Sequence, residues 1–250
     1  MKTAKLSTNA TNTAMVKRVG EKLATAVTNY MKSAGLSEDL QYYNWQFNLV
    51  QNNQVNAWCM PGGLICVYEG LLPVTQDEAS LAIVLGHEIA HAVARHSAEQ
   101  MSTQMKQQYG LQIGTAIAGA VGVGATAQSI GQWALSQQFN FKNLKYSRSH
   151  ESEADHLGLI FAAMAGYDPQ VAVPFWQRMA AKNGNSQQND LYSDHPSDAT
   201  RIKQIQEWMP EALRYYTPPT TTTTTAKKAT TTKKTTTKKT TTKKTTTKKK

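Results

Sequence analysis

AIVLGHEIAHAVARH, residues Ala82–His96, is the segment from which the rest of this 250-residue chain can be understood. Apolar residues occupy most sides of the helix it would form, which is typical of a buried helix. Within it, His87 and His91 are four residues apart, so both imidazoles share one helix face. Two histidines at this spacing can hold one Zn²⁺, and Glu88 is close enough to act on a water at the metal. Buried His and Glu side chains need polar partners, and a metal ion supplies them.

The helix that carries HEIAH is predicted to run from about residue 76 to beyond residue 100. Thr75 and Glu78 match the T-x-x-E capping box that often begins a helix. His96 follows His87 by about 900° of helix rotation, or half a turn away from the metal face. We therefore predict that His96 is a surface histidine.

A second helical pattern begins with SHESEAD, residues 149–155. A catalytic zinc takes three protein ligands and keeps one open position, and Glu151 can be the third ligand. Asp155, one turn later on the same face, can accept a hydrogen bond from the second ring nitrogen of a liganding histidine. Glu153 is about 200° away from Glu151 and fits this scheme poorly. Alone, this pattern would indicate a solvent-facing acidic helix, but beside HEIAH the metal site is favoured.

The N-terminal third is predicted to supply a scaffold helix and a small sheet. Residues 13–33 place apolar side chains at three- and four-residue steps, and Gly35 follows as a C-cap. Residues 41–50, QYYNWQFNLV, alternate in the manner of a strand. The segments QVNAWCM and LICVYE flank a Pro-Gly-Gly and indicate a hairpin.

The first hairpin strand contains Asn56, Ala57 and Trp58, directly before the metal helix. Its edge is a candidate for pairing with an extended peptide substrate, and an ordinary edge strand of a small sheet is the alternative. Cys59 and Cys66 stand on either side of the turn. The sequence leaves open whether they pair or stay reduced.

The segment from Gln107 to Phe141 contains no charged residue and is rich in Gly and Ala. A membrane-spanning helix needs about 20 apolar residues in a row, and Gln112 and Thr115 are among the polar residues that interrupt this segment. Small residues permit close helix packing. We favour a buried or hairpin helix over an interfacial segment that touches a membrane, and both over a true span.

The formal net charge of +10 is concentrated at the C-terminal end. Subtracting the 11 lysines of residues 217–250 leaves −1 for residues 1–216, so we expect no nucleic-acid partner. The Thr/Lys repeats of the tail cannot form a core, and we predict disorder there. A solvated charge run is the simplest interpretation, and contact of the lysines with a membrane or another anionic surface is the functional one.

Together these motifs resemble the M48 family of zinc metallopeptidases. The resemblance rests on HEIAH, on ESEAD some 60 residues later, on HPSDATR at 195–201, and on the Asn-Ala-Trp and Pro-Gly-Gly before the metal helix. It covers roughly residues 13–215 and is nearest to the bacterial envelope members and the mitochondrial Oma1 branch. It implies a gluzincin of the α+β class at residues 1–216: a mostly helical zincin-type metallopeptidase domain with a small antiparallel sheet.

The resemblance also implies the roles of the site residues. One Zn²⁺ per chain would be held by three ligands: His87, His91 and Glu151. Glu88 would be the general base. His195 would steady the tetrahedral oxyanion, or cap the zinc in a resting state, and Arg201 would orient that region.

We therefore expect a metalloendopeptidase that hydrolyses peptide bonds of partly unfolded proteins in cell-envelope quality control. Residues 1–20 contain no apolar segment of the kind found in signal peptides. Family members of this type usually begin with a lipoprotein signal or a membrane helix, so we expect a truncated or differently started envelope protein on the periplasmic side. The alternatives are a mostly latent zinc protein that binds envelope proteins like a chaperone, and a structural metal, which usually has four Cys or His ligands.

Overall fold

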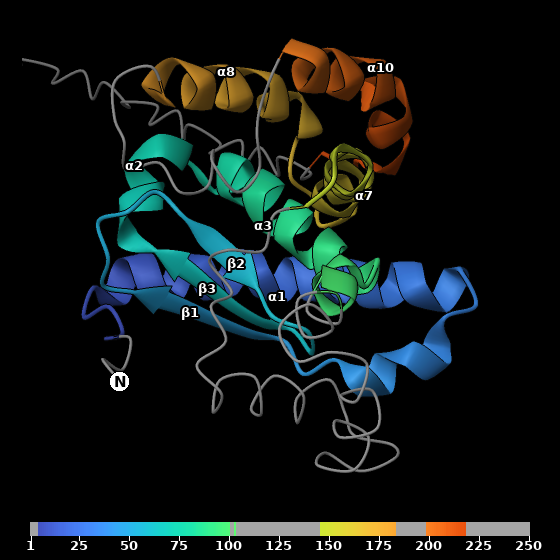
Figure 1. Ribbon diagram of the computed structural model, residues 1–250, viewed down its shortest axis with the longest axis horizontal. Helices are drawn as coiled ribbons and strands as arrows, with labels where there is room; N and C mark the ends of the chain where they lie inside the picture. Colours follow the sequence, from blue (N-terminus) through green and yellow to red (C-terminus); the bar gives the residue numbers. More distant parts are fainter. Residues whose placement is uncertain (1–4, 101–102, 104–145, 184–198, 219–250) are drawn as a thin grey trace, which may run out of the picture. The chain divides into compact units, whose positions relative to one another are not determined.

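A computed structural model describes residues 5–100, 103, 146–183 and 199–218 (Figure 1). The described chain is mostly helical and includes a small sheet, which confirms the predicted α+β class. The predictions for the uncharged segment 107–141 and for the tail from residue 219 onward lie outside the described residues. Among the helices of the described ranges, none is both long enough and apolar enough to cross a membrane.

The sheet has the strand order β1-β3-β2, with bounds β1 Gln46–Val50, β2 Ala57–Cys59 and β3 Leu64–Tyr68. β2 and β3 form the predicted antiparallel hairpin. Gly62 and Gly63 have φ values of 92° and 90° in its turn, where a side chain would be strained. β1 pairs with β3 in parallel, so the sheet is mixed rather than antiparallel throughout. The residues before β1 form a short 3-10 helix, η1 (Ser37–Tyr42), instead of the predicted strand.

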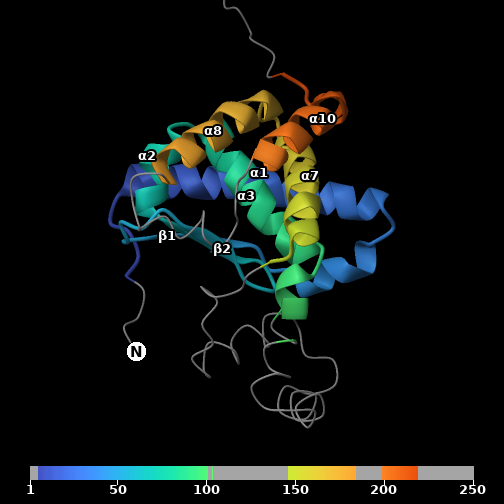
Figure 2. The same cartoon turned by 45° about the horizontal axis from the view of Figure 1, so that its top comes forward.

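One face of the sheet is covered by α1 (Ala10–Ser33) and α3 (Glu78–Val93), as Figures 1 and 2 show. The strand register turns one set of side chains toward these helices and buries them: Phe47, Leu49, Ala57, Cys59, Ile65 and Val67. Burial of each large apolar side chain contributes about 1.5–3 kcal/mol to stability. The core therefore fixes α3 over the sheet, next to β2.

The two cysteines are free and buried. Cys59 lies opposite Ile65, whereas Cys66 lies opposite Trp58. Residues directly opposite each other in a sheet share a face, and neighbouring pairs alternate between the two faces. The two thiols therefore point to opposite faces of the hairpin and cannot form a disulfide with each other.

α3 begins close to the predicted residue 76, but the predicted cap and the predicted C-terminal end are wrong. The N-cap is Asp77, whose carboxylate accepts a hydrogen bond from the Ser80 backbone N–H at 2.6 Å. Thr75 instead donates to the carbonyl of Leu72. At the other end, the helix stops at Val93, because Arg95 adopts a φ of 62° and turns the chain. Helical backbone resumes at residue 96, after this break.

α3 packs most extensively on α7 (Arg148–Met164), which carries ESEAD. The two helices cross at Gly86 and Gly158, where a Cβ added to Gly86 would lie 2.6 Å from the Gly158 carbonyl oxygen. A Cβ added to Gly158 would lie 2.6 Å from the backbone nitrogen of His87. Because both positions lack a side chain, the backbones approach closely and bring the two motifs face to face.

The remaining helices surround this pair. α10 packs on α7 and α8, and the short η2 and α2 connect β3 to α3. Pro210 lies inside α10 without ending it, and the helix continues to Tyr215. Asp168 caps η4, because its carboxylate accepts a hydrogen bond from the Gln170 backbone N–H at 2.9 Å. The bounds are η2 Glu69–Leu71, α2 Leu72–Thr75, η4 Pro169–Val171, α8 Ala172–Asn183 and α10 Ala199–Tyr215.

Candidate metal centre

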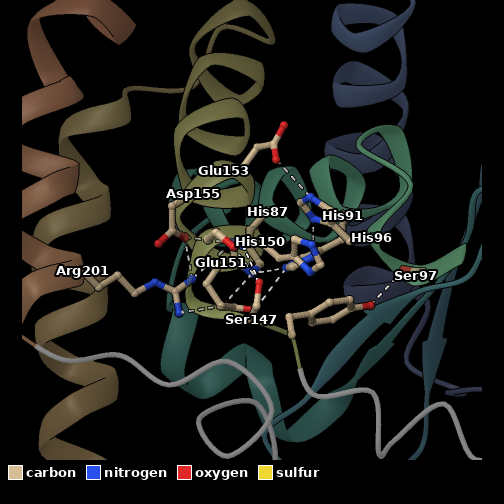
Figure 3. Close-up of polar contacts among 12 residues, drawn as sticks. His87, His91, His96, Ser97, Ser147, His150, Glu151, Glu153, Asp155 and Arg201 are labelled. Carbon is tan, nitrogen blue, oxygen red and sulfur yellow. Dashed lines mark hydrogen bonds and ion pairs between the residues drawn. The ribbon is translucent and has the colours of Figure 1, made fainter. Parts of the chain in front are cut away.

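The close helix crossing brings His87, His91 and Glu151 together (Figure 3). The Nε2 atoms of the two histidines are 3.0 Å apart. Glu151 places Oε2 at 3.5 Å from His87 Nε2 and Oε1 at 3.4 Å from His91 Nε2. All three side chains are buried, so their donor atoms face one another away from bulk water.

The donor set and its spacing fit a zinc ion. Two atoms bound to one tetrahedral zinc at about 2.0–2.1 Å lie about 3.3 Å apart, close to the spacings among these three side chains. The Nδ1 atoms of His87 and His91 face other protein groups, which leaves the Nε2 lone pairs to converge. Two imidazoles and one carboxylate form the three-ligand set of a catalytic zinc site.

Asp155 lies behind His87, on the side away from the converging donor atoms. Its Oδ1 lies 2.8 Å from His87 Nδ1. A carboxylate only accepts hydrogen bonds, so His87 Nδ1 carries the proton and Nε2 presents a lone pair that can bind a metal. This is the usual arrangement behind a liganding histidine.

Arg201 completes this side of the centre. It donates to Asp155 Oδ1 at 2.5 Å, and its Nη1 lies 3.5 Å from Glu151 Oε2. Its guanidinium stacks on the ring of Trp176 at 3.5 Å, within the range of a cation–π contact. Arg201 Nη2 is also 3.2 Å from His87 Nδ1, but both groups are donors, and this proximity follows from their shared acceptor. Trp176 was not among the predicted site residues, because an apolar position in a helical pattern does not indicate contact with a cation.

His91 is held differently. Its Nδ1 lies 3.1 Å from Nδ1 of His96, and Nε2 of His96 lies 3.2 Å from Glu153 Oε2. Tyr146 stacks on the His91 ring with centroids 3.9 Å apart, and its hydroxyl lies 2.9 Å from Ser97 Oγ. Burial raises the pKa of Tyr146, so its hydroxyl stays neutral. Figure 3 shows Glu153 and His96 on the side of the centre away from Arg201.

The prediction that His96 is a surface histidine is wrong, since it is 3% exposed. A rotation of 100° per residue does not apply beyond Val93, where α3 ends, and the turn at Arg95 brings His96 back behind His91. Burial lowers the pKa of His96, and the hydrogen bond to Glu153 opposes this shift. No glycine marks the turn, so the sequence offered no signal for it.

Glu88 lies beside His87 on α3 and is 3% exposed. Burial, followed by the nearby charge of Glu88, raises the pKa of the Cys59 thiol on β2. α3, which carries Glu88, packs on β2, the strand that contains Ala57 and Trp58. β2 is an edge strand of the described sheet, as the substrate-strand prediction requires. Asn56, just before it, is buried and accepts a hydrogen bond from the Tyr68 backbone N–H at 3.0 Å.

A cavity of about 360 Å³ opens beside Glu151. It lies between α7 and α10 and is lined mainly by polar side chains: Tyr146, Arg148, Glu151, Ser152, Asp155, Thr200, Arg201 and Gln204. The cavity thus reaches Glu151, one of the three candidate ligands. His195 lies outside the described residues, so its predicted role stays a prediction.

Comparison of the sequence with known proteins finds the peptidase family that these motifs indicate. The sequence profile described as "Peptidase family M48" matches residues 11–209. The chain is 36% identical over 170 residues to the mitochondrial metalloendopeptidase OMA1 of Schizosaccharomyces pombe, covering 67% of this chain and 48% of that protein. It is 33% identical over 176 residues to human OMA1, covering 68% and 33%. Metalloprotease YcaL of Escherichia coli is 27% identical over 165 residues, covering 64% and 61%. The chain thus spans about a third to a half of these OMA1 proteins.

Proposed function

Because this chain belongs to peptidase family M48, we propose that it is a zinc metalloendopeptidase whose metal ligands are His87, His91 and Glu151. The observation that carries the proposal is the convergence of their three donor atoms within 4.8 Å of one another. The chemistry of the donor set supports zinc over Mg²⁺ or Ca²⁺, which prefer oxygen ligands.

Glu88 is the proposed general base. A zinc ion held by the three ligands would lower the pKa of a bound water to about 7. Glu88 then accepts a proton as the water oxygen adds to the scissile carbonyl carbon. The carbon–nitrogen bond breaks and Glu88 returns its proton to the leaving nitrogen, which gives a carboxylic acid and an amine. Transfer of the acid proton to the amine leaves a carboxylate and an ammonium group. His195 would stabilise the negative charge that develops on the carbonyl oxygen.

Asp155 and Arg201 are proposed to position the site rather than to react. Asp155 fixes the ring of His87, and Arg201 neutralises the carboxylates on this side. The guanidinium lies against the ring of Trp176 and pairs with both carboxylates. It would therefore hold Glu151, and His87 through Asp155, in fixed orientations.

The substrate is proposed to be an extended segment of a partly unfolded protein. An edge strand can add a peptide as a further strand through backbone hydrogen bonds, which requires the peptide to be unfolded locally. This edge includes Asn56 and the first two residues of β2, Ala57 and Trp58, and β2 packs on α3, which carries Glu88. We propose that such substrates arise in protein quality control in a cell envelope. The relatives OMA1 and YcaL, which are named as a metalloendopeptidase and a metalloprotease, support a proteolytic role. The lysines of residues 217–250 would add contact with an anionic membrane surface.

The substitution Glu88→Gln tests the mechanism. We expect unchanged zinc content and a loss of about 10²–10⁴-fold in the rate of digestion of an unfolded protein such as casein. Zinc is measured by metal analysis of the purified full chain, and digestion by peptide release. Glu207→Gln changes an exposed glutamate on α10 and is the matched control, for which we expect unchanged zinc content and an unchanged rate of digestion. Digestion by Glu88→Gln at the wild-type rate would remove Glu88 from its role.

A further inference from the structure

His96 occupies a place that the proposed mechanism does not use. It is buried behind His91, on the side opposite the converging donor atoms. Its two ring nitrogens face different groups: Nδ1 faces His91, and Nε2 faces Glu153. Its ring stacks on that of His150, with centroids 4.2 Å apart and planes 16° from parallel. His150 in turn approaches Glu99 at 3.5 Å.

The carboxylate of Glu153 determines which ring nitrogen carries the proton in His96 and, through His96, in His91. Glu153 can only accept, so the proton of a neutral His96 ring lies on Nε2. Nδ1 of His96 is then an acceptor, and the facing Nδ1 of His91 must be the donor. With its proton on Nδ1, His91 has an unprotonated Nε2 toward His87 and Glu151.

We propose that His96 is a positioning residue for the metal centre, because it sets the ring orientation and the tautomer of His91 through a hydrogen-bonded chain that ends at Glu153. The inference rests on the proposed metal site. It concerns a residue outside the H-E-x-x-H motif and a carboxylate on α7 that does not bind the metal. Such outer partners of a liganding histidine typically influence metal affinity by about 10- to 100-fold.

The first test compares His96→Leu with His96→Asn. The two side chains have nearly the same shape, but only Asn keeps an oxygen acceptor near the position of His96 Nδ1. We expect His96→Leu to weaken Zn²⁺ binding by about 10- to 100-fold, and His96→Asn to stay within about threefold of the wild type. Affinity is measured on the full chain by competition with a chelator. The absorption spectrum of the Co²⁺-loaded protein should change for His96→Leu and not for His96→Asn.

The second test leaves the buried ring in place and changes its exposed partner. Glu153→Lys puts a donor opposite His96 Nε2, which turns Nδ1 into a donor that conflicts with His91. We expect a loss of about tenfold in Zn²⁺ affinity, whereas Glu153→Gln keeps an acceptor and the affinity. Glu99→Lys makes the same change of charge beside His150 and is the control, with wild-type affinity expected. Since Glu153 is exposed, these variants should fold even if His96→Leu does not.

The outcomes separate this inference from the proposed function. A wild-type chain that binds no Zn²⁺ would overturn both. Zinc binding by the wild type, with equal weakening in His96→Leu and His96→Asn or none in either, would overturn only the role of His96. Equal effects of Glu153→Lys and Glu99→Lys would also overturn it, because charge alone would then explain the loss.

Discussion

The two histidines of HEIAH lie one turn apart on the same helix, yet the protein supports them in different ways. Behind His87 stands Asp155, a buried carboxylate that is itself paired with the buried Arg201. Behind His91 stands His96, whose far nitrogen faces a glutamate with a 56% exposed side chain. The contacts behind His87 therefore end at buried groups, whereas those behind His91 end at a solvent-exposed carboxylate.

This difference predicts how strongly the stability of the protein depends on the contacts behind each histidine. A buried carboxylate and guanidinium depend on each other, since loss of either leaves a charge without compensation in the interior. An exposed carboxylate loses little when its partner is removed, because water replaces the contact. The His87 branch, made of Asp155, Arg201 and Trp176, should therefore be needed for folding. The His91 branch, made of His96 and Glu153, should mainly affect the metal.

Replacement of Asp155 by Ala should give the largest effect. It removes the acceptor of His87 and the closest partner of Arg201, so we expect a loss of about 3–5 kcal/mol in the free energy of unfolding. Urea unfolding of the metal-free protein measures this loss apart from any metal. A loss below about 1 kcal/mol would mean that the His87 branch is no firmer than an exposed ion pair.

Zinc tests whether the two branches meet at one ion. At a free concentration 100 times the dissociation constant, zinc should raise the free energy of unfolding by about 2.7 kcal/mol. Thermal unfolding with and without a chelator measures the gain. Both His87→Ala and His91→Ala should abolish it. A gain that survives in either variant would show that the two histidines do not share one ion.

Gly158→Ala should weaken both branches, because Asp155 and Glu153 are carried by the same helix. The added methyl group would lie 2.6 Å from the His87 backbone nitrogen and force α7 away from α3. We expect a net loss of about 1–3 kcal/mol by urea unfolding, although Ala favours a helix over Gly by about 1 kcal/mol. Zinc affinity should fall as well. A stabilised variant with normal zinc binding would contradict the close crossing.

Glu153→Ala should give the smallest change in stability. The exposed carboxylate contributes at most about 1 kcal/mol, and less at high ionic strength. Urea unfolding of the metal-free variant at low and high salt measures this contribution. A loss as large as that of Asp155→Ala would erase the difference between the two branches.

Local periodicity was sufficient to predict much of the centre. The spacing of His87 and His91 placed both rings on one face, and the spacing of Glu151 and Asp155 placed a ligand and its neighbour on another. The structure brings these faces together. The supporting contacts of His91 were not predictable in the same way, because they depend on a break in α3 at Arg95.

Pairing between distant segments was also beyond the sequence pattern. An alternating strand pattern identifies β1 but not its partner or direction, so the parallel pairing with β3 was missed. Likewise, HEIAH and ESEAD are joined in space by Gly86 and Gly158, whose close contact is visible only once both helices are placed. His195 remains a prediction that rests on family resemblance.

The opposite orientation of Cys59 and Cys66 has a consequence for the redox state of the folded protein. Neither thiol can reach the other, and burial raises the pKa of both, that of Cys66 to about 12. Reactive thiolate is therefore scarce at both positions. Once folded, the hairpin next to the candidate centre should therefore keep both thiols unpaired under reducing and under oxidising conditions.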